Sequence, residues 1–581
     1  MDKKSLMAIA LITVIILLLP TYYELIYDQP ELIEPSSQVI QEKPVEVKQP
    51  VTRNDLQPPV SEEKKEVAPE KQTKDKPELS SITQATELVV SEIETPLVSA
   101  KISNLGGGSF EYWYLKHYNT WIGNQAKIID PLLNNGIELT LINTNGEKIN
   151  FNEYKFEIEG TIPGHIELAE NDTYTIHYKL AIENHIIRKT ITIYGNSYHA
   201  DYTIKIGDAK SLLLNDEYEI SWINGLPSNE KNMVEDYTYS ESYARMGGEL
   251  ENFSIDSEEE VKPQPMNGTT EWIATRTKYF LSAIIPLQDN TIGAVFGGSG
   301  VKKDDILERR YNTSLVCKVD AESIDDTYRI FMGPMDYSVL SDYNNDLDGL
   351  IMNHGWYERT FRPISLLILK VFKFFQLFIP NYGIVIILFS ILVKIVVYPL
   401  TKKSYKSMKE MSKVQPLLAE LREKYKSDPQ RMNKETMKLY KEHGINPLGG
   451  CLPMLLQLPL LAALFIVFRS TIQLRGASFI AGWIDDLSRA DTIFTLPFSL
   501  PLYGNQFNIL PILMAGTMIF QSKMTMQDPK QKAMVYLMPI FMLLIFNQFP
   551  SGLNLYYTMF NLLTIVQQKW TDGTSKSSKN K

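Results

Sequence analysis

The feature that most limits how this chain can fold is a series of apolar runs after residue 380, each close to the length at which a helix crosses a bilayer. In lipid every backbone amide needs an internal hydrogen bond, so such runs become helices. They predict an α-helical polytopic membrane core, residues 380–570, with five transmembrane helices near 382–400, 447–468, 507–524, 533–549 and 552–567.

A further apolar run, residues 6–19, follows two lysines at the N-terminus. Its length also suits a cleavable signal sequence, which is the alternative interpretation. Small residues suited to cleavage do not follow the run, whereas Tyr22, Tyr23 and Tyr27 suit an aromatic belt at a membrane surface. We therefore expect an uncleaved transmembrane anchor over residues 1–27, which raises the number of transmembrane helices to six.

Basic residues indicate the direction of these helices. Residues 401–443 carry 12 Lys and Arg against 6 Asp and Glu, and positively charged loops stay in the cytoplasm. The loop 471–506 carries 2 Lys and Arg against 3 Asp, as an outside loop can. Both termini are then expected in the cytoplasm, and residues 571–581 form a basic cytoplasmic tail.

Charge also divides the chain into two parts. Residues 1–350 hold 31 Lys and Arg against 56 Asp and Glu, while residues 351–581 hold 27 against 12. Within the acidic part, residues 28–80 are rich in Pro, Glu, Lys and Gln and have almost no aromatic residues. Such a segment buries too little apolar surface to fold, so we expect a disordered tether outside the membrane.

The rest of the acidic part, residues 81–340, has short stretches of alternating polar and apolar residues, such as 173–180, 186–194 and 198–206, separated by turn residues. This alternation predicts antiparallel sheets and one large extracytoplasmic β-sandwich. Cys317 and Cys451 are the only cysteines and fall on different sides of the membrane, so no disulfide is expected. Ordinary strand positions are expected for five of the seven histidines, His117, His165, His177, His185 and His199.

Between the β-domain and the membrane core, residues 355–379 are predicted to form an amphipathic helix in the outer membrane interface. Its basic residues share one helical face and are expected to point towards phosphates. Four cations in this short stretch weaken the alternative that it begins a span. These residues are Arg359, Arg362, Lys370 and Lys373.

Lys394 lies inside the span at 382–400, where a cation is expensive and usually faces a polar cavity or a partner. The alternative is that its amine reaches the cytoplasmic surface, since only about 9 Å of helix separates it from Leu400. Neighbouring spans hold more polar groups than lipid-facing helices should, which favours a hydrated cavity. These polar residues are Ser390, Gln457, Asn554, Tyr556, Tyr557 and Asn561.

Residues 401–443 are predicted to form a cytoplasmic helical hairpin, because Met411, Val414, Leu418 and other apolar residues recur every three or four positions. The apolar stripe packs the two helices together. The exposed basic rim, with nearby methionines, favours partner binding. The rim residues are Lys402, Lys403, Lys406, Lys409, Lys413, Arg422 and Lys424.

The sequence has no P-loop, no dinucleotide-binding glycine pattern, no HExxH and no Cys/His cluster at metal-binding spacing. We therefore expect neither an enzyme nor a metal site. A solute transporter or channel remains an alternative, although the chain has no internal repeat. A carbohydrate enzyme or carbohydrate-binding module in residues 80–340, held on a membrane anchor, is another.

Several short motifs, in this order and spacing, resemble the bacterial YidC insertases of the YidC/Oxa/Alb family. They are YPLT at 398–401, QP at 415–416, NPLGGC at 446–451, PSGL at 550–553 and YY at 556–557. The resemblance covers roughly residues 355–570. The anchor, tether and outer domain are similar to the longer form found in bacteria with two membranes.

The resemblance implies a β-supersandwich for the outer domain and an inner-membrane insertase and chaperone that works without ATP or a cofactor. It also implies a hydrophilic groove that opens to the cytoplasm and to lipid and holds one cation. Lys394 occupies the place of that cation, where most relatives have Arg, and it keeps the charge without the planar fork. The other implied groove residues are Ser390, Tyr557, Gln457 and Asn561.

The implied partners are nascent membrane proteins, the ribosome, the Sec translocase and the phospholipid bilayer. No specific nucleic acid sequence is expected among them.

Overall fold

The computed structural model describes residues 82–182, 184–303, 306–426, 428–444, 452–525 and 532–577. The predicted N-terminal anchor, the predicted tether and the NPLGGC motif lie outside these residues.

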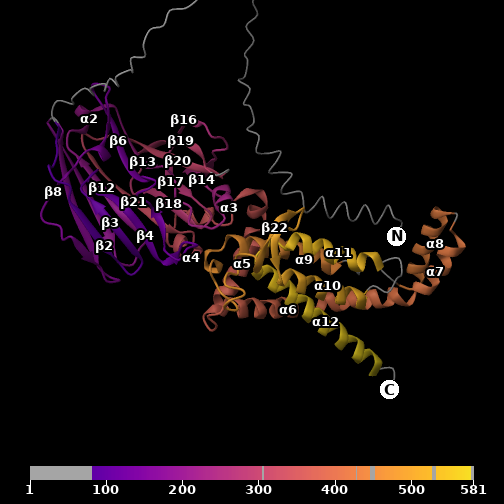
Figure 1. The fold of residues 1–581 in the computed structure, drawn as a ribbon. Helices are drawn as coiled ribbons and strands as arrows, with labels where there is room; N and C mark the ends of the chain where they lie inside the picture. Colours follow the sequence, from indigo (N-terminus) through magenta and orange to yellow (C-terminus); the bar gives the residue numbers. More distant parts are fainter. Residues whose placement is uncertain are drawn as a thin grey trace, which may run out of the picture. The chain divides into compact units, whose positions relative to one another are not determined.

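Three β-sheets make up the β-domain, residues 82–334 (Figure 1). The ten-stranded sheet has the order β1 (Ile82–Thr83), β10 (Thr173–Ile182), β11 (His185–Tyr194), β12 (His199–Ile206), β21 (Ile324–Pro334), β18 (Phe280–Pro286), β17 (Thr270–Arg276), β14 (Glu241–Met246) and β15 (Glu249–Phe253), with β8 (Glu157–Ile158) beside β10. The six-stranded sheet has the order β16 (Glu260–Asn267), β19 (Thr291–Lys303), β20 (Ile306–Lys318), β13 (Leu213–Ile223), β6 (Gly136–Asn143) and β7 (Lys148–Asn150). The five-stranded sheet has the order β5 (Gln125–Ile129), β4 (Ser109–Asn119), β3 (Val98–Ser103), β2 (Val90–Glu94) and β9 (His165–Glu167).

Short helical turns connect some of these strands and lead out of the domain. They are η1 (Phe151–Glu153), α2 (Ala209–Leu212), α3 (Met233–Thr238), α4 (Tyr337–Leu340), η2 (Ser341–Tyr343) and η3 (Leu347–Leu350).

The predicted alternating stretches are strands in the structure. They correspond to β10, β11 and β12, which pair with one another in an antiparallel ladder. Along β12 every second side chain is buried, at Ala200, Tyr202, Ile204 and Ile206. The prediction of antiparallel sheets in this region is therefore confirmed, and the five histidines named above all lie on strands.

Buried aromatic residues join the three sheets into one core. Trp113 on β4 donates from Nε1 to the carbonyl of Met332 on β21, at 2.9 Å. The hydroxyls of Tyr218 on β13 and Tyr328 on β21 lie 2.5 Å apart. Tyr328 also donates to the buried, free thiol of Cys317, at 3.0 Å. Each of these contacts spans more than ten residues of sequence, so strand alternation alone could not reveal them.

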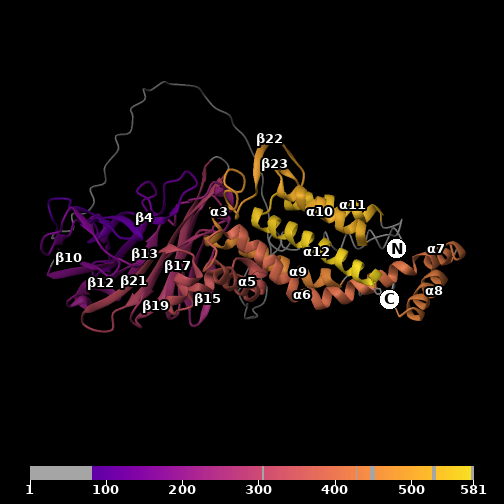
Figure 2. The ribbon, with the colours of Figure 1, turned by 90° about the horizontal axis from the view of Figure 1, so that it is seen from below.

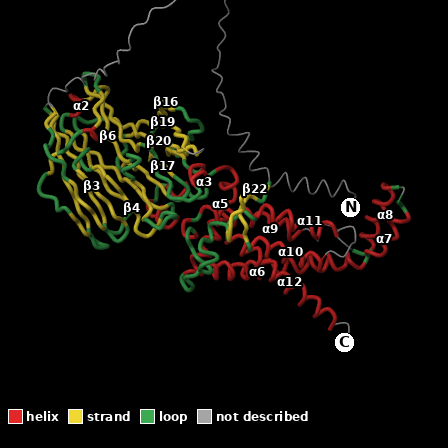
Figure 3. The backbone as a smooth tube through the Cα atoms, viewed as in Figure 1, coloured by secondary structure: helices red, strands yellow, loops and turns green. Residues whose placement is uncertain are grey.

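The chain changes from strands to long helices after the β-domain (Figure 3). The helices are α5 (Gly355–Gln376), α6 (Tyr382–Lys413), α7 (Gln415–Lys424), α8 (Pro429–Glu442), α9 (Leu452–Ser470), α10 (Leu510–Thr525), α11 (Lys532–Phe546) and α12 (Ser551–Ser577). Between α9 and α10 lie the turn η5 (Ile472–Leu474) and a hairpin of β22 (Thr492–Leu500) and β23 (Gly504–Asn508). Helix α12 packs against α6, α9 and α10 and is therefore the centre of the bundle.

Helices occupy all five predicted spans after residue 380, within the described residues. Among those residues, one window, Tyr382–Pro399, is both long and apolar enough to cross a bilayer. Gln457–Ser470 and Val535–Phe546 are apolar but shorter. Helix α6 continues to Lys413, well beyond the predicted boundary at Leu400. Pro399 lies inside the helix and does not end it.

Ion pairs connect the β-domain to the end of α9 and the loop after it. Arg469 pairs with Glu235 on α3 at 2.9 Å. Glu230, just before α3, pairs with Arg489 at 2.9 Å and also with Arg475. These contacts place the loop between α9 and α10 on the same side of the helical core as the β-domain.

One of the four basic residues of α5, Arg362, differs from expectation in what it contacts. Arg362 donates to the carbonyl of Ile351 at 3.0 Å and to the carbonyl of Asp348 at 2.8 Å, so it fastens α5 to the preceding turn rather than facing phosphates. Lys370 and Lys373 are exposed. Arg362 also pairs with the carboxylate of Asp348 at 3.2 Å. The sequence did not reveal this arrangement because the other two acceptors are backbone carbonyls, which any residue can supply.

Candidate functional site

Lys394 is buried between α6 and α12. Its ammonium donates to Thr564 Oγ1 at 2.7 Å and lies 4.6 Å from the centroid of the Phe560 ring. The side chain is 8% exposed, and no described carboxylate lies within ion-pair distance. An ammonium has three N–H donors, so one described acceptor leaves two donors for water, lipid or a bound polypeptide.

Helix α12 presents a row of polar side chains, most of them buried and spaced three or four positions apart, which puts them on one face. Several have polar atoms without a hydrogen-bond partner among the described residues, including Asn554 Oδ1 and both terminal atoms of Gln568. We name this row the polar face of α12; it consists of Asn554, Thr558, Asn561, Thr564 and Gln568.

Of the predicted groove residues, Lys394 contacts this face through Thr564, and Asn561 belongs to it. Asn561 donates to Thr517 on α10 at 3.3 Å. Ser390, one turn from Lys394, is fully buried and donates to the carbonyl of Ile386 at 2.8 Å, within its own helix. Tyr557 lies beside Gln457 of α9, although its buried hydroxyl is not within hydrogen-bond geometry of any described group.

Sequence reasoning missed four residues around this site: Thr401, Thr558, Thr564 and Gln568. Thr564 is the acceptor for Lys394, and Thr401 accepts from Gln567 at 3.3 Å further along α6. The signal was available, because Thr558 and Thr564 share the helical spacing of Asn554 and Asn561. Threonine was overlooked because it is common in membrane helices as a packing residue.

The region predicted to form a helical hairpin contains α7 and α8. Val414 and Leu418 are buried between them, with Met411, Leu439 and Tyr440 packed around. Lys402, Lys413 and Lys424 are exposed, and Arg422 is half-buried. The side chains of Lys403, Lys406 and Lys409 lie outside the described residues. Partner binding by these basic residues stays a prediction.

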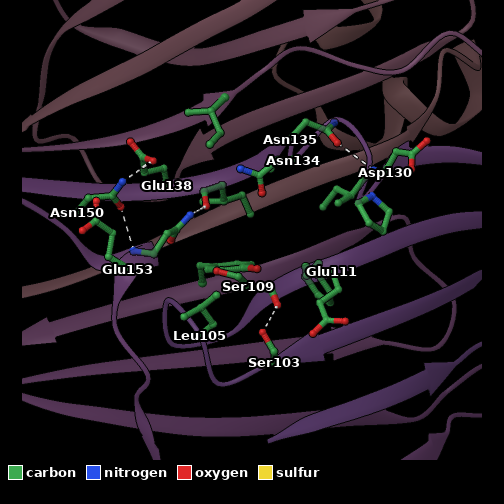
Figure 4. A pocket seen from close by; sticks show the side chains of 18 of the residues that line it. Ser103, Leu105, Ser109, Glu111, Asp130, Asn134, Asn135, Glu138, Asn150 and Glu153 are labelled. Carbon is green, nitrogen blue, oxygen red and sulfur yellow. Dashed lines mark hydrogen bonds between the residues drawn. The ribbon is translucent and has the colours of Figure 1, made fainter. Parts of the chain in front are cut away.

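The β-domain has a cavity of about 510 Å³, shown in Figure 4. Its acidic residues have partners in the domain: Glu111 pairs with Lys101 at 2.8 Å, and Glu138 accepts from Asn150 at 2.8 Å. Lys189 also lines it, is 3% exposed and donates to the carbonyl of Gly106 at 2.6 Å. Burial lowers the pKa of Lys189 to about 7.

Comparison with known proteins agrees with this division into a β-domain and a helical core. Residues 91–367 match the family model of the YidC periplasmic domain, and residues 374–579 match that of the 60Kd inner membrane protein. The membrane protein insertase YidC of Chlorobium luteolum is 36% identical over 495 residues, covering 84% of this chain and 83% of the relative. That of Chlorobaculum tepidum is 36% identical over 504 residues, covering 85% and 82%.

A solved structure, an active YidC insertase with its first transmembrane domain resolved, is 18% identical, with a TM-score of 0.33, covering 84% of this chain and 93% of that chain. A TM-score this low adds nothing to the argument, which is carried by the family models and the relatives.

The chain is therefore a membrane protein of the inner membrane with a large periplasmic β-domain. It belongs to the YidC family of membrane protein insertases, which is not a family of enzymes.

Proposed function

We propose that this chain inserts hydrophobic segments of nascent membrane proteins into the inner membrane, along a groove formed by α6 and the polar face of α12, with Lys394 as its single cation. The observation that carries the proposal is the buried ammonium of Lys394, which has one described acceptor, Thr564, and no described counter-ion. Membrane helices keep such a group where it meets water or a partner.

The groove acts by lowering the cost of moving a polar client tail partway across the bilayer. Polar side chains and the water they hold replace hydrocarbon beside the tail, which reduces the desolvation penalty. Lys394 attracts acidic residues of that tail. Burial of the client's apolar helix, about 20 residues long, then drives it into lipid without nucleotide hydrolysis.

The proposed topology has six spans with both termini in the cytoplasm. Exposed Leu367 and Phe374 on α5, and Leu377 just after it, support a position of that helix against the outer membrane surface. On the cytoplasmic side, the exposed cations around α7 receive the emerging chain from the ribosome or the Sec translocase.

The test compares Lys394→Glu, Lys394→Arg and the unchanged protein in liposomes that receive a ribosome-synthesised client with an acidic tail. Lys394→Glu should abolish protease-protected insertion, because like charges repel, and Lys394→Arg should preserve it. Lys262→Glu is the control, since it reverses an exposed cation on β16 of the β-domain, outside both the groove and the hairpin. Equal insertion by all proteins would remove the electrostatic step.

The role of the hairpin is tested by deleting residues 405–440. Insertion should stop, while the rest of the chain keeps its helical content and its protease-resistant β-domain. Normal insertion by this variant would refute a receiving role for the hairpin.

A further inference from the structure

The β22–β23 hairpin, with its turn, exposes an unusual amount of apolar surface. Residues 492–508 contain no charged side chain at all. Phe498 is 57% exposed and Leu502 is 60% exposed, and Ile493, Phe494 and Leu500 are also exposed. A contiguous apolar patch of this kind on a protein surface normally marks contact with a partner or a membrane.

The turn of the hairpin holds an apolar residue where the backbone favours a small one. Leu502 has φ of +65°, the left-handed region that usually takes glycine or asparagine. Gly504, two residues later, has φ of +82° and meets that requirement without cost. A leucine at the strained position keeps a large apolar side chain at the tip of the hairpin.

The hairpin is fixed to the ends of two predicted spans. Asp491 accepts hydrogen bonds from the first amides of α10, at Ile509 (2.9 Å) and Leu510 (2.7 Å). Asn547, just after α11, donates to the carbonyls of Tyr503 (2.9 Å) and Gln506 (2.7 Å). The position of the hairpin is therefore set by the start of α10 and the end of α11. Figure 2 shows both strands beside these helices.

The apolar patch continues onto the exposed sides of those helices. Ile512 and Leu513 on α10, and Leu537 and Ile540 on α11, are exposed apolar residues. In the proposed topology these residues face lipid. A protein-binding patch would carry a polar or charged rim, whereas this hairpin is uncharged throughout and continues into a lipid-facing surface.

We propose that the β22–β23 hairpin dips into the periplasmic leaflet of the inner membrane and anchors the periplasmic end of α10 and α11 there. The occupant of its apolar patch is the acyl-chain region of the lipid. The inference rests on the proposed topology, in which α10 and α11 cross the bilayer.

The test places a spin label at one of three exposed leucines in the full chain, reconstituted into vesicles of phosphatidylethanolamine and phosphatidylglycerol. Leu502→Cys probes the hairpin, Leu537→Cys is the control for lipid, and Leu132→Cys in the β-domain is the control for water. The background is Cys451→Ser. Cys317 stays unlabelled because it is buried, and burial raises the pKa of its thiol to about 12.

Collision with oxygen, which concentrates in lipid, is compared with collision with a nickel chelate, which stays in water. The proposal expects the oxygen-to-nickel ratio at 502 to match that at 537 and to exceed that at 132 several-fold. A ratio at 502 like that at 132 overturns the proposal while leaving the topology intact. Low collision with both reagents at 502 also overturns it, since protein then covers the patch.

If the label at 537 itself behaves like the one at 132, then the proposed topology fails and the hairpin proposal fails with it. A second label, Phe498→Cys on the strand, checks that the result belongs to the hairpin as a whole. The oxygen-to-nickel ratio at position 498 should equal the ratios at positions 502 and 537 or fall between them. A ratio at 498 like that at 132 would contradict burial of the hairpin in the leaflet.

Discussion

The β-domain and the helical core each bury one lysine without a described carboxylate partner. Lys189 on β11 donates to the carbonyl of Gly106, and its ammonium lies 5.7 Å from the centroid of the Tyr202 ring. Lys394 on α6 donates to Thr564, with the Phe560 ring 4.6 Å away. Burial, one oxygen acceptor and an aromatic ring are therefore common to both residues.

The surroundings of the two lysines differ. Lys189 lies in a domain whose acidic cavity residues already pair with other side chains, such as Glu111 with Lys101. Lys394 lies beside the polar face of α12, where Asn554 and Gln568 keep buried polar atoms without described partners; the cavity beside Lys189 also holds one such atom, Asn152 Oδ1. Neither a buried lysine nor a single unpaired polar atom defines a site by itself. Lys394 differs because buried polar side chains continue along α12 on both sides of its acceptor, at Asn561 and Gln568.

The largest expected effect concerns Lys189 and pH. Its pKa is about 7 in the folded protein, against the ordinary 10.5, because of burial. Between pH 7 and pH 10.5 the lysine is protonated in the unfolded chain but not in the folded protein. The free energy of unfolding of the β-domain should therefore rise with pH, by up to ~1.4 kcal/mol per pH unit. Below pH 7 both states are protonated and this contribution levels off at its least favourable value.

The stability of the β-domain is measured as the urea concentration at which the buried thiol of Cys317 becomes reactive. The measurement is made at pH 7, 8 and 9 in the Cys451→Ser background, and the reactivity is corrected for ionisation of the thiol. Lys189→Met should remove the rise. An equal rise in the variant would show that other groups cause it, and the comparison of the two lysines would lose its electrostatic basis.

The next effect is on insertion and separates the two lysines directly. Lys394→Met keeps the length of the side chain but removes its charge, and insertion of an acidic-tailed client should fall about tenfold, or ~1.4 kcal/mol in the barrier. Lys189→Met should leave the rate within about twofold. The readout is the rate of protease protection in liposomes. Similar losses in both variants would mean that the charge in the groove has no special role.

The smallest effect tests the hydrogen bond to Lys394. Thr564→Val removes the acceptor while keeping the shape of the side chain, and should change insertion a few-fold, corresponding to ~1 kcal/mol for one hydrogen bond. Thr558→Val, on the same face of α12 but without a described bond to Lys394, is the matched control. If both variants behave alike, then the polarity of the face matters more than the orientation of the ammonium.

The sequence predicted the strands and helices well where the pattern is local. Strands β10, β11 and β12 lie where the alternation placed them. Burial of Lys189 was not predicted, although it stands in the inward-facing row of Ile187 and Ile191 on β11. The acceptor that makes its burial possible, the carbonyl of Gly106, lies 83 residues away in the sequence and could not be predicted.

Long-range contacts were beyond prediction from one sequence. The bond from Trp113 to Met332 and the ion pairs of Glu230 with Arg475 and Arg489 join residues more than 200 positions apart. Nothing in local periodicity selects one arginine over another as a partner for a given glutamate. Helical spacing places Thr564 on the polar face of α12, but its pairing with Lys394 depends on how α12 faces α6, which one sequence does not give.

Helix α6 has a mechanical consequence. It runs unbroken from Tyr382 to Lys413, so Lys394 and the start of the α7–α8 hairpin belong to one rod. Nineteen residues, about 28 Å of helix, separate Lys394 from Lys413. If α6 moves as one body, then a displacement at Lys413 also displaces the ammonium of Lys394 relative to α12, and the two ends of the helix are mechanically coupled.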